Sequence, residues 1–320
     1  MFYITLNSVV LEVFVLVGAA FFTLMERSGL GYIHNRKGPN KVGYMGLFQP
    51  FGDAIKLFSS EIIYPYMGNY NYYFICPVMG LLMSLFIWMI VPYSENLYIF
   101  NFGVLFILSC LGLGVYFLIF AGWSSNSKYS LLGCLRAVAQ MVSYEVGLMI
   151  ILLGGVLMIS SLNLILFFEY QKLFWFIFIL FPIIMMWFIM SLAETNRSPF
   201  DLAEGESELV SGFNVEYMGG SFSLIMLSEY SSIMFMSLMI IILGMSSSLF
   251  SLIFYLKLVF IGYIFIWIRG SLPRMRYDNL MEFSWKIVLP ISLNFMMYYS
   301  GLIIFLDKMV VWKILSKESY

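Results

Sequence analysis

The sequence predicts an all-α polytopic membrane protein with about eight transmembrane helices, and three observations support this. Hydrophobic residues make up 62% of the 320-residue chain and charged residues only 11%, whereas a typical soluble domain carries about 25% charged residues. The apolar residues form runs of about 20, the length that crosses a bilayer as a helix. These runs are too uniformly apolar for barrel strands, which alternate over about 10 residues.

The same composition excludes several classes of protein. A globular core of this length could not bury so much apolar surface, so a soluble enzyme is excluded. Disorder requires low hydrophobicity and high charge, which is the opposite composition. The net charge of −1 argues against binding of nucleic acid, which requires a surplus of basic residues.

The predicted spans follow one another along the whole chain, so residues 1–320 are expected to form a single integral membrane domain. They are expected at Tyr3–Met25, Tyr73–Pro92, Phe102–Trp123, Leu135–Ser160, Leu173–Ala193, Ser223–Gly244, Leu249–Ile268 and Ile287–Leu306. The first span has no basic residue before Arg27, so it lacks the start of a signal peptide and we expect it to be retained.

Basic residues are concentrated in the loops after the odd-numbered spans. These loops hold 12 of the 17 basic residues, namely Arg27, Arg36, Lys37, Lys41, Lys56, Lys128, Arg136, Arg197, Arg269, Arg274, Arg276 and Lys286. Basic loops stay on the cytoplasmic or matrix side. We therefore expect the long loops, at about residues 26–72, 194–222 and 269–286, to lie on that side and both termini on the other.

The first long loop is expected to contain a short amphipathic helix. Leu47, Phe51, Ala54 and Phe58 recur at helical spacing, and Pro50 suits a first helical turn. Such a helix lies in the membrane interface or packs on a partner, and the spacing alone does not decide between these.

The chain lacks the residues of a redox or metal site. Cys76, Cys110 and Cys134 are widely spaced and His34 is the only histidine, which cannot supply a zinc, iron–sulfur or bis-histidine haem site. The glycine-rich motifs that bind nucleotides are also missing. We expect no catalytic redox centre, cofactor site or metal site here, and we interpret the cysteines as small buried hydrophobic residues.

Charged residues inside the predicted spans are candidates for function. Glu12, Glu145, Glu229 and Lys257 lie within spans, and Glu194 closes the fifth. Charges in the bilayer are costly and commonly mark ion or proton pathways. The carboxylates therefore indicate a proton or ion path, with pairing to basic residues as the alternative.

The loop after the fifth span is strongly acidic. Between Glu194 and Glu216 it holds six acids against Arg197 alone: Glu194, Asp201, Glu204, Glu206, Glu208 and Glu216. Acids so close together do not all ionise, so some are expected to stay protonated. A run of charges is usually a solvated loop, whereas the interleaved apolar residues indicate burial, and the sequence leaves both open. Residues 198–201 also match a capping box, which predicts a helix with Pro199 in its first turn.

Basic residues flank the ends of the first and seventh spans. Arg27 and Arg36 follow the first span, and Arg274 and Arg276 follow the seventh. They either anchor the protein at lipid headgroups or line a polar vestibule, and their spacing fits both.

Taken together, these motifs resemble the chain 1 family of respiratory NADH:ubiquinone oxidoreductase, complex I. The resemblance rests on Glu26-Arg27 with residues 36–40, on Gln49-Pro50 with Asp53 and Lys56, and on residues 121–128, 135–145, 193–214 and 273–278. It covers essentially the whole chain, residues 193–214 are its most specific part, and the mitochondrially encoded form fits best. Asn35 and Met275 depart from the family pattern, which leaves the detailed shape of the vestibule open.

The resemblance implies a core membrane subunit of a proton-pumping enzyme, in the mitochondrial inner membrane with both termini in the intermembrane space. Ubiquinone is then the substrate. FMN and iron–sulfur clusters belong to partner subunits, and the partners are other membrane-arm subunits, the quinone-proximal peripheral arm and membrane lipids. By the same resemblance, the ubiquinone chamber involves Glu26, Arg27, Arg36, Asp53, Arg274 and Arg276. The proton path involves Glu145, Glu194, Asp201, Glu204, Glu206, Glu216 and Glu229.

Three other functions fit the spans and charges less well. A proton-coupled secondary transporter commonly shows inverted internal repeats, and none is visible. A membrane anchor of a hydrogenase-type complex would share the charged motifs without acting on quinone. A purely structural anchor for a peripheral protein is the third.

Overall fold

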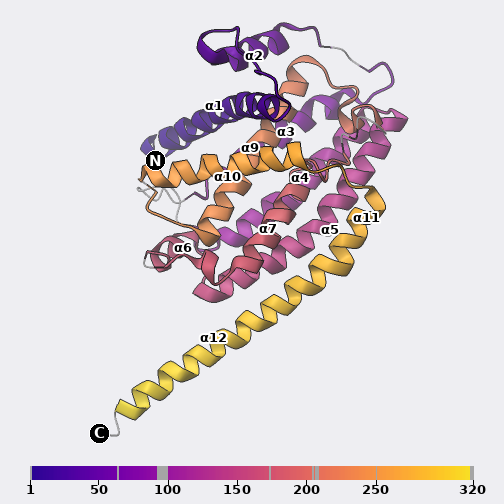
Figure 1. Ribbon diagram of the computed structural model, residues 1–320. Coiled ribbons are helices and arrows are strands. Elements are labelled where there is room, and N and C mark those ends of the chain that lie inside the picture. The colour runs from indigo at the N-terminus through magenta and orange to yellow at the C-terminus, as the bar shows by residue number, and fades with distance from the viewer. Residues whose placement is uncertain are drawn as a thin grey trace.

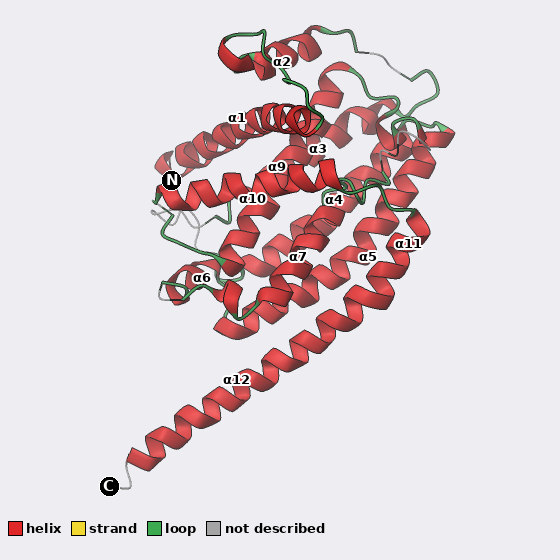
Figure 2. Cartoon of the chain, viewed as in Figure 1, coloured by secondary structure: helices red, strands yellow, loops and turns green. Residues whose placement is uncertain are grey.

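The computed structural model describes residues 2–62, 65–91, 100–172, 174–203, 205, 209–249 and 251–317. This part of the chain contains helices and no strand, so the predicted all-α class is confirmed (Figure 2). The helices are α1 (Phe2–Ile33), α2 (Gln49–Ser59), α3 (Tyr70–Trp88), α4 (Gly103–Ser124), α5 (Lys128–Ile159), α6 (Leu164–Tyr170), α7 (Phe181–Glu194), α9 (Gly219–Gly244), α10 (Leu252–Ser271), α11 (Tyr277–Glu282) and α12 (Leu289–Lys317). Short 3-10 turns (η1, Tyr44–Gly46; η2, Phe176–Phe178; η3, Gly212–Asn214) and a π-helical segment (η4, Phe283–Val288) complete the description.

Within the described residues, seven helices are long and apolar enough to cross a membrane. They correspond to seven of the eight predicted spans, with α11, η4 and α12 forming the last one. The fifth predicted span differs, because the turn η2 precedes α7, a helix of only 14 residues. At 1.5 Å per residue α7 is about 21 Å long, shorter than the roughly 30 Å hydrocarbon core.

Two spans are longer than the apolar runs that predict them. α1 continues from Met25 to Ile33, and α5 starts at Lys128, ahead of the predicted Leu135. Hydropathy ends a span at its first charged residues, but the backbone hydrogen bonds of a helix continue through them. Charged residues such as Glu26 and Arg136 are therefore held on rigid helices.

Helix α9 is the central helix of the bundle. It packs against α3, α1, α10 and α7, while α4 packs on α3 and α5, and α5 also contacts α7 and α12. Figure 1 shows that α1 begins, and α12 ends, at the end of the bundle opposite α2. We call the end that carries α2, the segment between α7 and α9, and the segment between α10 and α11 the inner end.

The predicted amphipathic helix of the first loop is confirmed as α2, with Pro50 in its first turn. Asp53 binds Arg27 of α1, and the ring of Phe51 meets Phe21 edge-on at 5.9 Å. Ile55 and Phe58 remain 69% and 62% exposed. An exposed apolar face on a helix at the bundle rim agrees with an interfacial location, which stays a prediction.

The prediction that a helix begins at Pro199 is wrong. The amide of Phe200 donates to Arg197 O at 2.8 Å, which closes a turn, and residues 198–203 contain no helix. Asp201 does not cap a helix, because its carboxylate binds Arg274 at 3.2 Å. A long-range ion pair has replaced the local capping interaction that the sequence pattern favours.

Candidate functional site

Irregular backbone follows α7 and is buried in the inner half of the bundle. Residues 194–203 are buried or nearly so, and Asn196 has a left-handed backbone (φ 49°). Non-helical backbone is tolerated at membrane depth only inside protein or beside a polar cavity, because its polar groups need partners. The fully buried Gln140 of α5 supplies two, since its amide nitrogen donates to Ala193 O and Phe200 O, both at 2.8 Å.

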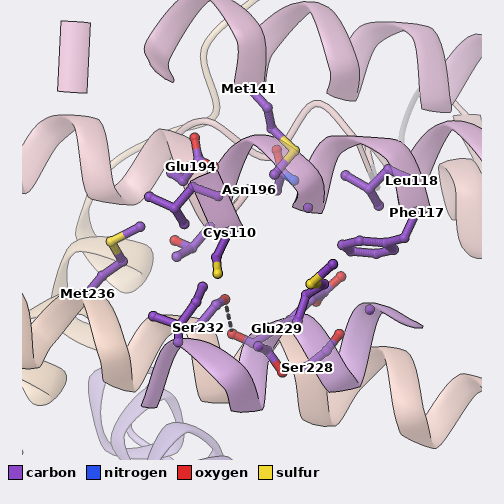
Figure 3. Close-up of a pocket in the computed structure, with 17 residues that line it drawn as sticks. Cys110, Phe117, Leu118, Met141, Glu194, Asn196, Ser228, Glu229, Ser232 and Met236 are labelled. Carbon is purple, nitrogen blue, oxygen red and sulfur yellow. Dashed lines mark hydrogen bonds between the residues drawn. The ribbon is translucent and has the colours of Figure 1, made fainter. Parts of the chain in front are cut away.

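A cavity lies beside this segment, between α3, α4, α5 and α9 (Figure 3). In Figure 3, Glu194 and Asn196 lie on one wall and Ser228, Glu229 and Ser232 of α9 on the opposite wall. About 80 Å³ is available to the centres of water-sized molecules. A water molecule needs about 10–15 Å³ by this measure, so the cavity has room for several.

Two of the predicted proton-path carboxylates are close enough to interact in this region. Glu194 ends α7 and is 6% exposed, and its Oε2 has no hydrogen-bond partner among the described residues. Glu145 of α5 acts on it electrostatically. Glu145 lies one turn beyond Met141, which lines the cavity.

Glu229, the third of these carboxylates, forms a buried ion pair. Arg197 Nη2 lies 3.3 Å from Glu229 Oε2, with side-chain exposures of 10% and 18%. The Arg197 guanidinium also lies 4.6 Å from the ring centroid of Tyr230. Arg197 thus fixes a carboxylate of the cavity wall and stacks on the next residue of α9.

Tyr230 extends this contact toward α1 and α10. Its hydroxyl donates to Glu26 Oε2 at 2.6 Å, and Glu26 Oε1 accepts from Arg269 of α10. Glu26 is only 6% exposed. The side chains of Glu229, Arg197, Tyr230, Glu26 and Arg269 therefore form a chain of polar groups from the cavity to the α1–α10 interface, which we call the crossing network.

A second link joins the two groups of predicted site residues. Asp201, assigned to the proton path, binds Arg274, assigned to the quinone chamber, at 3.2 Å. The amide of Met275 donates to Pro199 O at 2.9 Å. The segment after α7 is thereby held against the segment after α10.

The other predicted chamber residues lie nearer the surface. The Arg27 and Asp53 side chains, which bind each other, are 54% and 33% exposed. Arg276 and Asp278 form a pair at 3.0 Å with exposures of 78% and 66%. Arg36 is exposed in the loop after α1. Exposed ion pairs contribute at most about 1 kcal/mol to stability, so breaking them costs little. These residues are therefore available to a ligand or partner.

Glu216 is held at the start of α9 by its neighbours. Its backbone oxygen accepts from the Tyr73 hydroxyl at 2.6 Å, and the Tyr73 ring stacks on Tyr217 at 4.4 Å. Burial raises the pKa of Tyr217, so this phenol stays protonated and can donate to Ala121 O, 3.4 Å away. Of the remaining predictions, Glu204 and Glu206 lie outside the described residues.

Sequence reasoning did not assign Arg197, Tyr230, Arg269 or Gln140 to the site. One signal was available, because Glu229 and Tyr230 are adjacent polar residues inside an apolar run. The pairing of Glu26 with Arg269 carries no sequence signal, since the two residues are 243 positions apart.

The fold and site define a polytopic membrane protein with buried, mutually paired charges at one end of its helix bundle. The sequence profile of the NADH dehydrogenase family matches residues 6–300, and the chain belongs to that family. It is 56% identical over 300 residues to NADH-ubiquinone oxidoreductase chain 1 of Anopheles gambiae, covering 94% of this chain and 96% of the relative. For the same chain of Aedes aegypti the identity is 55% (95% and 97% covered), and for that of Locusta migratoria it is 52% (94% and 96%).

Proposed function

We propose that this chain is a core membrane subunit of proton-pumping NADH:ubiquinone oxidoreductase, with ubiquinone as substrate. In this role it forms the ubiquinone access chamber and couples quinone reduction to proton translocation through buried carboxylates. The family membership and the names of the relatives support the class of enzyme. The site residues rest on the contacts described above.

The observation that carries the proposal is the crossing network. Tyr230 contacts Glu26, a proposed chamber residue, through its hydroxyl, and it contacts Arg197 through its ring. Arg197 in turn binds Glu229 at the cavity. Two contacts, Glu26 with Tyr230 and Tyr230 with Arg197, therefore connect Glu26 to the ion pair of Arg197 and Glu229. A change of charge or geometry at Glu26 can reach that ion pair through them.

Quinone reduction takes up two electrons and two protons, so it changes the charge of the chamber. Coupled carboxylates respond to such a change by redistributing protons. We assign this response to Glu26, Glu229, Glu194 and Glu145, with Asp201 and Arg274 as a parallel link. The cavity between Glu194 and Glu229 offers space for the water molecules that would carry protons between them.

The electrons come from other subunits in this proposal. An iron–sulfur cluster requires four thiolate ligands, or two with two histidines, and Cys76, Cys110 and Cys134 lie on three different helices. The ligands of this chain do not fit such a cluster, so we assign the clusters and FMN to partner subunits. All three cysteines are buried, as their interpretation as hydrophobic residues predicts.

The location follows from the family and from the basic loops. We assign the chain to the mitochondrial inner membrane as one integral domain, with the inner end facing the matrix and both termini facing the intermembrane space. The peripheral arm would then dock on the inner end. Other membrane-arm subunits and lipids would cover the exposed apolar faces of the helices.

Replacing Tyr230 by Phe tests the proposal. The ring under Arg197 stays, and only the hydrogen bond to Glu26 is lost. A hydrogen bond to a charged group is worth about 1.5–3 kcal/mol, so ubiquinone reduction and its coupled pumping should fall by about tenfold or more. The measurement is NADH:ubiquinone activity and proton uptake of the assembled complex in proteoliposomes.

Tyr255→Phe is the matched control, because Tyr255 is 50% exposed on α10 and lies outside the crossing network. Reduction of a hydrophilic artificial electron acceptor should be unchanged in both variants. Equal ubiquinone activity and pumping in Tyr230→Phe and Tyr255→Phe would remove Tyr230 from the coupling path.

A further inference from the structure

The carboxylate of Glu145 rests against a gap in the neighbouring helix. An ideal Cβ built on Gly112 of α4 would lie 2.8 Å from Oε1 of Glu145, 3.7 Å from its Cδ and 3.9 Å from its Oε2. Real Cβ atoms essentially never lie within 3.0 Å of a heavy atom of a residue that is not their neighbour in the chain. The end of the Glu145 side chain therefore occupies space that exists only because residue 112 has no side chain.

Among the glycines of α4, Gly112 is the one at which an added Cβ would meet a charged side chain. Glycine weakens a helix interior relative to alanine, so a glycine there calls for a reason. At Gly114, two residues further on, an added Cβ would have Phe117 as its nearest neighbour, at 4.0 Å. At Gly122 an added Cβ would lie 2.3 Å from Cβ of Cys134 of α5, so the two helices are closely packed at both Gly112 and Gly122, but only Gly112 accommodates a carboxylate.

We propose that Gly112 is a positioning residue, whose missing side chain forms a notch that sets the direction of the Glu145 carboxylate toward Glu194. The inference rests on the proposed role of Glu145 in the proton path. Residues on both sides of the notch, Leu111 of α4 and Met141 of α5, line the cavity that Glu194 also lines. Glu145 is half-buried and packs on the α4 side of α5. With the notch filled, its carboxylate must turn away from this place.

Gly112→Ala in the assembled complex tests the notch. The atom that must move is the far end of a flexible side chain, so the helix can keep its place while the carboxylate turns. We expect the rate of proton pumping to fall about tenfold, since small misplacements of reacting groups cost rates of this order or more. The loss should be as large as that of Glu145→Gln. Gly301→Ala is the control, because a Cβ at Gly301 of α12 meets nothing within 4 Å.

A fourth variant distinguishes positioning from a general packing defect. Glu145→Asp shortens the side chain by one methylene, so its carboxylate no longer reaches the added methyl group. The double variant Gly112→Ala/Glu145→Asp should therefore pump better than the product of the two single losses predicts. If the pumping loss of the double variant equals the product of the two single losses, the proposed role of the notch is contradicted.

The remaining outcomes separate the notch from the proton-path assignment. Normal pumping by Gly112→Ala, together with impaired pumping by Glu145→Gln, contradicts the proposed role of the notch. It leaves Glu145 in the proton path. Normal pumping by Glu145→Gln removes Glu145 from the proton path, and the notch loses its role with it. Equal losses in Gly112→Ala and Gly301→Ala would show a nonspecific effect of the added methyl group and overturn the notch.

Discussion

Replacing Arg197 by Met is expected to prevent stable assembly of the inner end of the bundle. Arg197 and Glu229 are 10% and 18% exposed, and replacing Arg197 takes the opposite charge of this ion pair away from a largely buried carboxylate. This costs about 3–5 kcal/mol, a large fraction of the 5–15 kcal/mol that stabilises a typical protein. The loss of the Tyr230 stacking contact adds to it. The measurement is the yield and melting temperature of the assembled complex.

The control for this substitution is Lys286→Met. Lys286 pairs with Glu282 at 2.8 Å on the surface, with exposures of 70% and 64%. A solvated pair of this kind contributes about 0–1 kcal/mol, so its removal should leave the melting temperature nearly unchanged. Similar melting temperatures of the two variants would contradict the structural importance of Arg197.

Replacing Glu194 by Gln is expected to abolish most proton pumping while the complex stays assembled. The amide has nearly the same shape, and Oε2 of Glu194 has no hydrogen-bond partner among the described residues, so packing changes little. Only the ability to take up and release a proton is lost. Proton transfer by a positioned side chain contributes about 10²–10⁴-fold, so pumping should fall by about a hundredfold. The measurement is proton uptake during NADH oxidation in proteoliposomes.

Glu169→Gln serves as the comparison for Glu194→Gln. Glu169 lies on α6, at the end of the bundle opposite the inner end (Figure 1), and does not line the cavity, so its replacement should leave pumping unchanged. Pumping by Glu194→Gln at the rate of Glu169→Gln would exclude Glu194 from the proton path.

Most of the fold follows from hydropathy, because an apolar run of about 20 residues has few alternatives to a membrane-spanning helix. The short length of α7, which begins only at Phe181 after the turn η2, does not follow from it. The apolar run from Leu173 to Ala193 is as hydrophobic as a full span, and nothing local reveals that Gln140 satisfies the backbone beyond Glu194. Hydropathy measures transfer into the membrane and does not register buried hydrogen-bond partners from another helix.

The acidic residues of the candidate site could be predicted from the sequence, but their partners could not. Charges in an apolar chain stand out, so Glu26, Glu194 and Glu229 are visible in the sequence. Their partners depend on how distant helices pack, as with Glu26 and Arg269. The notch at Gly112 is hidden for a related reason, since a glycine in an apolar run has the same appearance whether or not a carboxylate rests against it.

The central claim is that the proposed chamber and the proposed proton path form one coupled unit through the crossing network. A double-mutant cycle between Glu26→Gln and Glu229→Gln, with quinone-driven proton pumping as the readout, tests it most directly. Residues that act through one network show non-additive effects. We expect the double variant to pump about as well as the worse single variant, and losses that multiply independently would contradict the coupling.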